Sequence, residues 1–406
     1  MIHYSCIGAT GYVCGEVLRM MVNHHEGELV NVLDTYGVGD AISTHHPALR
    51  GFYDQVIMDL TEENVRETAK KSDVIMIQVP SGDVAKWAEI VLAEDCAIID
   101  IGADIRFRDV DVWEKWYGQK HPDAKMTHDA VYCIPEVMRD LAKGKKLIAN
   151  PGCYPTASTL GLQPMLKTGH IVENTIVIDA KSGFTGAGRR PALNKLLTEA
   201  ENNFCAYALG GGHRHTPEIE QNIAYITGKD LMKPETWQYI NFQPHLLPQV
   251  RGIEVTIYAT CDRDFTNEEV YELYKDFYKD EPFVKVFPAS LPVQTKWVYG
   301  TNFCEMTPTF DTRTHRLIVS SVIDNAIKKR ENKKPDVAVL YSDLPCSCAA
   351  CFTTNKFCAA PVILDREILK KGKARAVVIN SGNANAATGK QGIEDARTVE
   401  REAEKL

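Results

Sequence analysis

The chain has 406 residues, of which 44% are hydrophobic and 25% charged, and its formal net charge is −8. This length exceeds the usual size of one hydrophobic core, so we expect two or three domains. The acidic balance argues against a nucleic-acid partner, which would need a concentrated basic face, but it allows a local pocket for an anionic small molecule. No apolar run approaches the roughly 18 residues of a membrane span, so we expect no membrane partner.

The start of the chain and the cysteines predict the compartment. Residues 1–8 enter an apolar strand pattern directly, without the basic segment that opens a secretory signal. The 12 cysteines are scattered along the chain. Both features favour a cytoplasmic protein with reduced thiols.

In residues 1–149, short β-branched runs alternate with helical stretches. That alternation predicts a parallel sheet with helices on both faces, the Rossmann-type α/β fold, which binds ligands at the carboxyl ends of its strands. The expected strands are 2–7, 29–33, 74–79, 97–101 and 146–149, and the clearest helices are 16–23 and 83–93.

From about residue 150 the strands are separated by long helical or irregular stretches, which predicts a mixed sheet in a second, α+β domain. The expected strands there are 175–180, 238–242, 252–261 and 317–323. A charged run, Lys328 to Pro335, is typical of a junction, and the tail beyond it is too short for a robust core of its own. We therefore divide the chain into 1–149, 150–325 and 326–406.

A glycine-rich turn, Gly8 to Gly15, follows the first expected strand and opens a helix. Its glycines let the backbone approach a pyrophosphate, and the helix N-terminus favours the negative charge. We interpret the turn as a dinucleotide-binding loop, and a tight turn without a ligand is the alternative.

Cys153 stands in the segment Asn150 to Pro155, directly before a predicted helix that Pro155 suits as a first residue. A helix N-terminus offers free N–H groups and a dipole that stabilise a thiolate. We interpret Cys153 as a nucleophile, and the alternative is a small buried cysteine in a turn.

A thiol nucleophile needs a partner that handles protons, and His213 and His215 follow three glycines in a suitable segment. A metal pair lacks a clear third ligand, and a purely structural pair is the other alternative.

The loop from Lys181 to Arg190 offers glycine N–H groups, hydroxyls and two arginines that suit a phosphate or carboxylate, unless it is a flexible surface loop. Arg106 follows a strand end, where it suits a substrate carboxylate or an ordinary ion pair.

Residues 1 to about 325 resemble the N-acetyl-γ-glutamyl-phosphate reductase family of the semialdehyde dehydrogenase superfamily. The resemblance is carried by Gly8 to Tyr12, 100–104, 150–156, Ser182 to Arg189, His213 to Gln221, 244–252, Thr295 and Lys296. It implies that the Cys153 thiolate attacks the acyl carbon of N-acetyl-γ-glutamyl phosphate, that phosphate leaves, and that NADPH reduces the thioester to N-acetylglutamate semialdehyde, with His215 as acid–base.

The resemblance also implies the rest of the site and the assembly. It implies a homodimer or homotetramer and no metal. The implied substrate-binding residues are Arg106, Ser182, Arg189, Tyr207, His213 and Glu218, and the implied cofactor-binding residues are Gly8, Thr10, Gly11, Tyr12, Pro80, Gly183 and Gly186.

The tail from about residue 333 resembles the early part of the glutamate N-acetyltransferases, through 352–355, 359–362 and 378–385. The resemblance implies an oxyanion-hole pair at Thr388 and Gly389, but its nucleophilic threonine has no counterpart here, so we predict no acetyltransferase activity. Four tail cysteines, Cys346, Cys348, Cys351 and Cys358, fit no common zinc spacing, and we expect small residues packed in strands.

Three positions depart from the reductase pattern. Cys14 replaces the last glycine of the loop, although Gly15 follows it. Asp34 suits a ribose hydroxyl and repels a 2′-phosphate, which makes NAD possible beside NADP. After Asn325 the family continues into a final helix near the cofactor, which this chain lacks. Natural fusion and an error in gene prediction both give such a junction.

Two other functions stay open on the sequence alone. An aspartate-semialdehyde dehydrogenase shares the cysteine–histidine logic, although the motif from His213 to Gln221 favours the acetylated substrate. A chimera with impaired cofactor binding would fold without activity and persist as an assembly or regulatory partner.

Overall fold

The computed structural model describes residues 1–189, 192–326, 337–352, 359–380 and 389–403. The chain divides into two compact units, Met1–Asn332 and Lys333–Leu406, and each is described by itself. Within these ranges, no helix combines the length and the apolar character needed to cross a membrane. The expected junction run, 328–335, lies outside the described residues.

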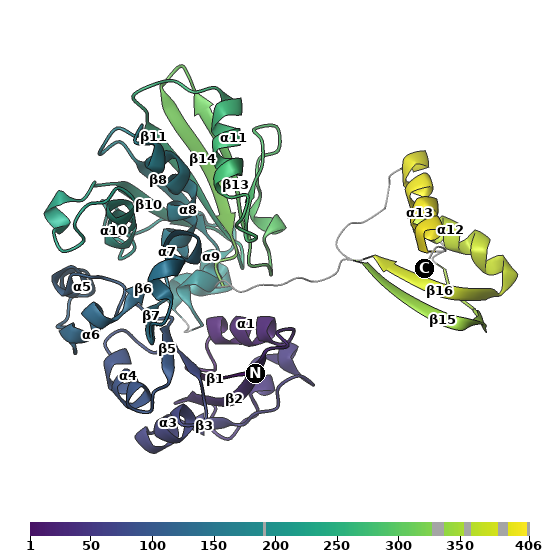
Figure 1. The fold of residues 1–406 in the computed structure, drawn as a ribbon, viewed down its shortest axis with the longest axis horizontal. Helices are drawn as coiled ribbons and strands as arrows, with labels where there is room; N and C mark the ends of the chain where they lie inside the picture. The colour runs from purple at the N-terminus through teal and green to yellow at the C-terminus, as the bar shows by residue number, and fades with distance from the viewer. Residues whose placement is uncertain (190–191, 327–336, 353–358, 381–388, 404–406) are drawn as a thin grey trace. The chain divides into compact units, whose positions relative to one another are not determined.

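The first half of unit 1 is a parallel sheet, as predicted, with helices between its strands (Figure 1). In the part of the chain that the structure describes, seven strands form this sheet in the order β3-β2-β1-β4-β5-β7-β6. The strand order reverses between β1 and β4, which is where open α/β sheets bind ligands. The elements are β1 (Ile2–Ile7), α1 (Tyr12–Met21), β2 (Gly27–Asp34), α2 (Ile42–His45), η1 (Pro47–Leu49), β3 (Ile57–Asp59), α3 (Glu62–Ala69), β4 (Val74–Ile77), α4 (Val84–Ala93), β5 (Ala97–Asp100), α5 (Val110–Tyr117), α6 (Ala124–Asp129), β6 (Val131–Tyr132), α7 (Pro135–Ala142) and β7 (Leu147–Ala149).

The second half of unit 1 holds the predicted mixed sheet. Its seven described strands run in the order β12-β13-β14-β11-β8-β10-β9. The pairs β8–β10 and β12–β13 are parallel, and the other pairs are antiparallel. The elements are α8 (Cys153–Thr168), β8 (Val177–Ser182), η2 (Phe184–Ala187), η3 (Leu193–Lys195), α9 (Leu197–Ala200), β9 (Cys205–Ala206), α10 (Thr216–Ile226), η4 (Pro234–Thr236), β10 (Asn241–Leu246), β11 (Ile253–Thr260), α11 (Asn267–Phe277), β12 (Val284–Val286), η5 (Thr295–Trp297), β13 (Cys304–Asp311) and β14 (Arg316–Ile323).

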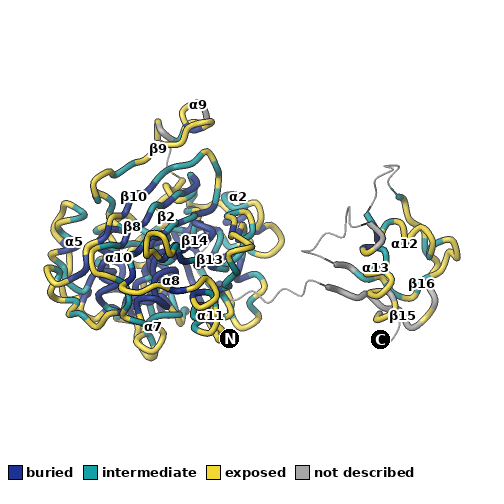
Figure 2. Tube along the Cα trace, turned by 90° about the horizontal axis from the view of Figure 1, so that it is seen from above, coloured by how far each residue is buried: buried dark blue, intermediate teal, exposed yellow. Residues whose placement is uncertain are grey.

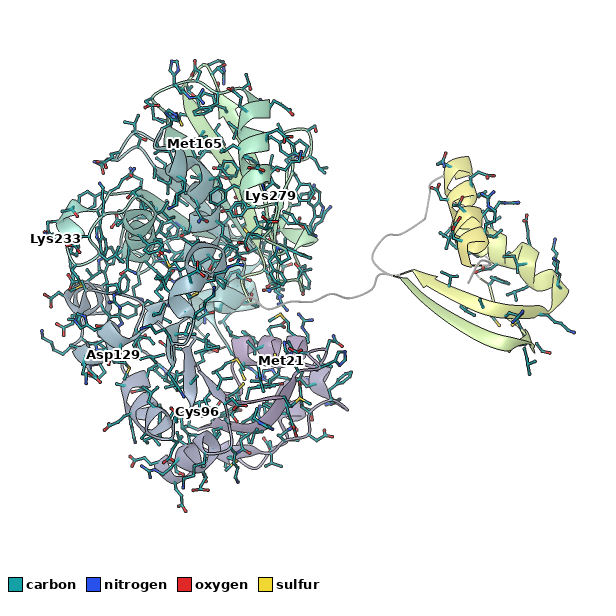
Figure 3. All side chains as sticks on the ribbon, viewed as in Figure 1. Met21, Cys96, Asp129, Met165, Lys233 and Lys279 are labelled. Carbon is teal, nitrogen blue, oxygen red and sulfur yellow. The ribbon has the colours of Figure 1, made fainter. Side chains whose placement is uncertain are left out.

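The core of unit 1 explains why these elements form. β11 alternates buried and half-buried residues along its whole length, the two-residue period of a strand with one face on the core. Helix α8 is buried almost throughout, because it lies against β11 and β14 on one side and α10 on another. Met21 and Cys96 are buried in the first half of unit 1, and Met165 is buried in the second half (Figure 3). By contrast, the segment around α9 and β9 is mostly exposed (Figure 2).

Unit 2 is small. It consists of β15 (Val337–Ser347) paired antiparallel with β16 (Lys373–Asn380), and of α12 (Ala360–Ile368), η6 (Leu369–Lys371) and α13 (Gly389–Ala403). The expectation that the tail cysteines are packed in strands is wrong for Cys346 and Cys351, which are exposed. Cys358, the motif residues 353–355 and 381–385, and Thr388 of the implied oxyanion-hole pair lie outside the described residues.

Candidate active site

Cys153 is the first residue of α8, two residues earlier than the helix start that Pro155 suggested. β7 ends at Ala149, and Gly152 in extended conformation is the N-cap of the helix. The thiol is therefore half-buried in the first turn, at the carboxyl edge of the parallel sheet. Here the free N–H groups and the helix dipole favour a negative charge.

His215 lies directly against the backbone beside Cys153. A Cβ atom placed on Gly152 would stand 2.6 Å from His215 Nε2 and 3.0 Å from an Arg106 nitrogen, so only glycine fits there. His215 is the N-cap of α10, whose buried face packs on α8. The fold thus brings together two residues 62 positions apart, as the acid–base interpretation requires.

His213 supports His215 through the backbone and the ring. The His215 N–H donates to His213 Nδ1 at 3.0 Å, and the two rings meet edge to face with centroids 4.8 Å apart. Tyr154 also packs edge to face on both histidines. Burial, aided by the charge of Arg214, lowers the pKa of His213 to about 4, so this ring is neutral at pH 7 and its Nδ1 can accept.

The neutral His213 predicts a pH dependence of stability. Its pKa in the folded protein lies below the ordinary 6.5, so the unfolded chain takes up a proton first as the pH falls. Its contribution is present above about pH 6.5 and is lost towards pH 4. Urea unfolding at pH 7 and pH 5 should show that wild type loses about 1–2 kcal/mol more than His213→Gln over this step.

The control for this experiment is His128→Gln, which changes an exposed histidine. This variant should follow wild type at both pH values. An equal loss in His213→Gln and wild type would contradict the buried neutral histidine.

Glu218 is fully buried beneath the site. Its Oε1 accepts from the Gly152 N–H at 2.7 Å and from the Tyr132 hydroxyl at 2.9 Å, and its Oε2 lies 3.1 Å from Arg106 Nη1. Arg106 also donates to the carbonyls of Asn150 (2.9 Å) and Ile101 (3.2 Å). The ion-pair alternative for Arg106 is therefore what the structure shows, and contact of Arg106 or Glu218 with substrate stays a prediction.

Two further predicted substrate residues reach the same cluster and one does not. The Tyr207 hydroxyl lies 3.2 Å from that of Tyr154, and burial raises the pKa of Tyr207 to about 12. Ser182 is buried at the end of β8. Arg189 instead donates to the Thr10 carbonyl at 2.8 Å, so it lies on the dinucleotide loop and not with Cys153. Arg190 lies outside the described residues.

The dinucleotide loop has the geometry that its glycines predict. Gly8 has φ +83°, and a Cβ there would stand 2.0 Å from the Gln78 carbonyl oxygen of the neighbouring strand end. Gly11 is the N-cap of α1, and no side chain caps it, so the first N–H groups of α1 can take a pyrophosphate. Exposed Tyr12 begins α1. Exposed Pro80 follows β4, the strand beside β1 where the strand order of the sheet reverses.

Contacts in the structure explain two of the departures from the reductase pattern, Cys14 in this loop and Asp34 beside it. Gly15 takes over the close packing expected one position earlier, because a Cβ there would meet the His46 ring at 2.2 Å, while Cys14 is buried. Asp34 accepts from the Thr10 N–H and hydroxyl through Oδ2, both at 2.8 Å, and from the Thr35 N–H through Oδ1 at 2.7 Å. Asp34 therefore holds the loop itself.

At Gly183 and Gly186, neighbouring atoms lie too close to leave room for a side chain. A Cβ on Gly183 would meet the Gln249 carbonyl oxygen and the Arg251 nitrogen at 2.9 Å, and one on Gly186 would stand 3.1 Å from Asn325 Nδ2. The Gly183 N–H donates to the Gly252 carbonyl at 2.9 Å. Their role in cofactor binding stays a prediction.

Cys153 lines an apolar cavity of about 310 Å³, which no pattern in the sequence indicates. It lies between the two halves of unit 1, and Val17, Met20, Phe303 and Ile323 are among its lining residues. Asp324, just before the expected break at Asn325, lines the cavity as well. In the residues described, no group of three or more histidine, cysteine or acidic side chains is arranged to hold a metal.

Comparison with known proteins identifies the family. The models of the semialdehyde dehydrogenase NAD binding domain and dimerisation domain match residues 5–145 and 153–325, and the ArgJ family model matches 320–406. The structure is similar to aspartate semialdehyde dehydrogenase II from Vibrio cholerae, with a TM-score of 0.60 at 16% identity over 81% of this chain and 94% of that chain. A Candida albicans aspartate semialdehyde dehydrogenase solved with NADP has a TM-score of 0.55 at 12% identity, over 80% of this chain and 95% of that one. These two likenesses show the fold alone.

Curated relatives are much closer in sequence. The N-acetyl-gamma-glutamyl-phosphate reductase of Desulforudis audaxviator is 42% identical over 328 residues, which cover 81% of this chain and 92% of the relative. That of Moorella thermoacetica is 40% identical with the same coverage. The chain belongs to the N-acetyl-gamma-glutamyl-phosphate reductase family of the semialdehyde dehydrogenases.

Proposed function

We propose that this chain reduces N-acetyl-γ-glutamyl phosphate to N-acetylglutamate 5-semialdehyde and phosphate, a step of arginine biosynthesis, with NADPH as the reductant. The observation that carries the proposal is the placement of His215 Nε2 against Gly152, beside a thiol at the start of α8. Family membership at 42% identity supports the acetylated substrate over the aspartate-type alternative.

In the proposed mechanism, the Cys153 thiolate forms a bond to the acyl carbon and the carbon–oxygen bond to phosphate breaks. The resulting thioester carbon accepts a hydride, the chemistry that a bound nicotinamide dinucleotide supplies. His215 takes the proton of the Cys153 thiol, gives it to the oxyanion of the reduced thioester carbon to form the thiohemiacetal, and accepts it again as the carbon–sulfur bond breaks and the thiolate leaves. His213 holds the His215 backbone, while Glu218 fixes Gly152 and Arg106.

The experiment is an assay of both directions with two substrate pairs. Purified protein should reduce N-acetyl-γ-glutamyl phosphate and oxidise N-acetylglutamate semialdehyde in the presence of phosphate. Activity on the free, unacetylated compounds should be at least about 100-fold lower, since an unfilled pocket for the acetyl group costs about 3 kcal/mol. Preference for the free, unacetylated compounds would support the aspartate-type alternative, and absence of both activities would support the inactive chimera.

The position of Arg189 supports the proposal of NADPH rather than NADH as the reductant. Its guanidinium lies 2.8 Å from the Thr10 carbonyl, and Thr10 is held by Asp34, the residue at the end of β2 where a ribose is expected. We expect Arg189→Ala to raise the KM for NADPH about tenfold, the loss of one charge-assisted hydrogen bond, and to change the KM for NADH much less.

Arg313→Ala is the control, because Arg313 is exposed and pairs with Asp311, away from the loop. It should leave both KM values at the wild-type level. Equal effects of Arg189→Ala on NADPH and NADH would show that Arg189 does not recognise a 2′-phosphate.

We also propose a cytoplasmic homodimer or homotetramer. The match of residues 153–325 to a dimerisation domain supports the assembly, and the described cysteines, which form no disulfide with one another, support a reducing compartment. Analytical ultracentrifugation at micromolar concentration should show a species of two or four chains, and a monomer would contradict the assembly.

A further inference from the structure

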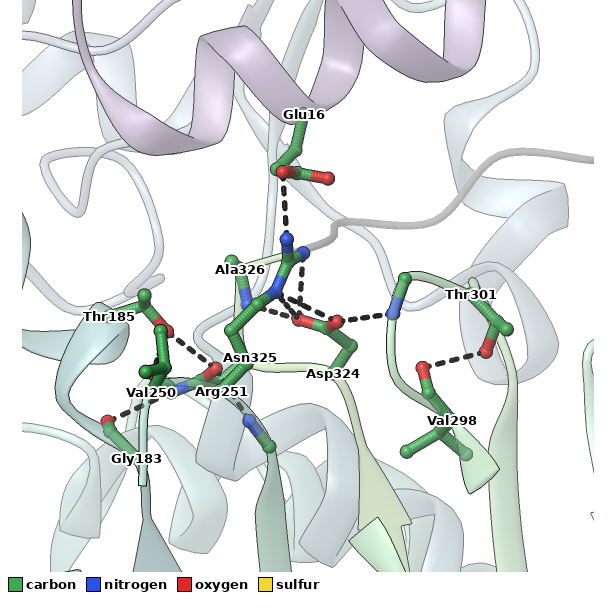
Figure 4. A network of polar contacts seen from close by, with 12 residues as sticks. Glu16, Gly183, Thr185, Val250, Arg251, Val298, Thr301, Asp324, Asn325 and Ala326 are labelled. Carbon is green, nitrogen blue, oxygen red and sulfur yellow. Dashed lines mark hydrogen bonds and ion pairs between the residues drawn. The ribbon is translucent and has the colours of Figure 1, made fainter. Parts of the chain in front are cut away.

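Asp324 and Asn325 end the part of the chain that matches the dimerisation-domain model, and both side chains are buried. They follow β14 directly. The sequence marks Asn325 only as the last residue before the departure from the reductase pattern, and no local pattern predicts a role for either side chain. Their contacts, however, join segments from both halves of unit 1 (Figure 4).

Asp324 belongs to an ion-pair chain that reaches α1. Arg251 Nε lies 3.0 Å from Asp324 Oδ2, and Arg251 Nη1 lies 2.8 Å from Glu16 Oε1 on α1 (Figure 4). The Asp324 carboxylate also accepts from the N–H groups of Gly300 (2.8 Å) and Ala326 (2.9 Å). The end of β14 is therefore fixed to the helix that opens at the dinucleotide loop.

The Asn325 amide makes three hydrogen bonds to residues 182–185 and one to Gly252. Oδ1 accepts from the Gly252 N–H at 3.0 Å and from the Thr185 hydroxyl at 2.9 Å. Nδ2 donates to the Gly183 carbonyl at 3.0 Å and to the Ser182 hydroxyl at 3.2 Å. An amide has two donor hydrogens and an oxygen that accepts two bonds, so residues 182–185 and Gly252 together satisfy the Asn325 amide.

Gly186 fits against the same amide. A Cβ on Gly186 would stand 3.1 Å from Asn325 Nδ2 and 3.1 Å from the Ser182 hydroxyl. The N–H groups of Phe184 and Thr185 are in turn bonded to the carbonyls of Gln249 and Val250. The conformation of residues 182–186 is thus set by Asn325 on one side and by 249–252 on the other.

We propose that Asn325 is a positioning residue that holds segment 182–186 in the conformation needed for substrate and dinucleotide, and that the Asp324–Arg251–Glu16 ion pairs fix this assembly to α1. The proposal rests on the proposed function, in which Ser182, Gly183 and Gly186 belong to the binding sites. It goes beyond that function, because it gives the last two residues of the dimerisation-domain match, Asp324 and Asn325, a role in shaping the binding site.

The test uses the full chain with Asn325→Ala and Gly186→Ala. Each should raise the KM for N-acetylglutamate semialdehyde and for NADP⁺ about tenfold, as expected for loss of one or two buried hydrogen bonds, while kcat changes less. Alkylation of Cys153 by iodoacetamide should stay within about twofold of wild type, because Asn325 does not contact α8 in the described hydrogen bonds. The two substitutions act on one contact, so the double variant should be no worse than the more affected single one.

A readout independent of activity separates this proposal from the proposed function. Hydrogen exchange of the Gly183, Phe184 and Thr185 amides should be about tenfold faster in Asn325→Ala than in wild type. Asn31→Ala, which removes a side-chain hydrogen bond to Thr68 in the other half, should leave these amides unchanged. If wild type lacks reductase activity but the exchange result holds, the function fails and the positioning role stands. Wild-type exchange rates and KM values in Asn325→Ala would overturn the proposal.

Discussion

Replacing Cys153 with serine is expected to lower the rate of semialdehyde-dependent NADP⁺ reduction by a factor on the order of 10³ or more. Serine keeps the size and position of the side chain, so the start of α8 and the contact between Gly152 and His215 should persist. A hydroxyl, however, ionises far less readily than a thiol and forms an ester in place of a thioester. The assay follows absorbance of the reduced cofactor in phosphate or arsenate.

Cys346→Ser is the matched control, because it makes the same chemical change at an exposed cysteine of unit 2. It should keep the wild-type rate. A Cys153→Ser variant that retains more than about a tenth of the activity would rule out Cys153 as the nucleophile. Loss of activity in both variants would point to a general effect of thiol removal.

Glu218→Gln is expected to destabilise unit 1 by about 3–5 kcal/mol. The substitution leaves the charge of Arg106 buried without its partner, and it places an amide where the carboxylate accepts from Gly152 and Tyr132. The free energy of unfolding in urea at pH 7 measures the change. Activity of the remaining folded protein should also fall, since the Gly152 N–H precedes the nucleophile.

Glu220→Gln is the matched control, because Glu220 is a second buried glutamate of α10, two residues further along and on a different face of the helix. Glu220 is also buried, and burial raises its pKa to about 7, so about half of the Glu220 carboxyl groups are already uncharged at pH 7. Its Oε1 accepts only from the Ile240 N–H, at 3.2 Å, among the described hydrogen bonds. A neutral glutamine should therefore cost less than about 1 kcal/mol. Similar losses in the two variants would contradict the special role of the Glu218–Arg106 pair.

The sequence predicted the elements whose local pattern is strong. The first strand was predicted with the bounds that the structure has, Ile2–Ile7, because its mostly apolar strand pattern leads directly into a glycine turn. β13 (Cys304–Asp311) was missed, since Glu305, Thr307 and Pro308 interrupt its apolar residues although the strand is almost wholly buried. β6 has two residues, too few for any periodic pattern.

The candidate site divides along the same line. Cys153 and His215 lie at helix starts, which nearby glycine and proline residues indicate in the sequence. Residue type and position therefore predicted that the two side chains belong to one site. The position of Arg189 on the dinucleotide loop had no local signal, because the contact with Thr10 spans 179 residues. The same holds for Arg251 and Asp324, which meet only after β11 and β14 have paired.

The helix starts at Cys153 and Thr216 have one more consequence. Gly152 and His215 are the N-caps of α8 and α10 and are in contact, so the positive ends of two helix dipoles meet at one point. Each end carries the equivalent of about half an elementary charge. In the proposed reaction, an anionic leaving group released there would therefore be stabilised by peptide groups of the main chain. That part of the field does not depend on any basic side chain, and substitution of a lysine or arginine cannot remove it.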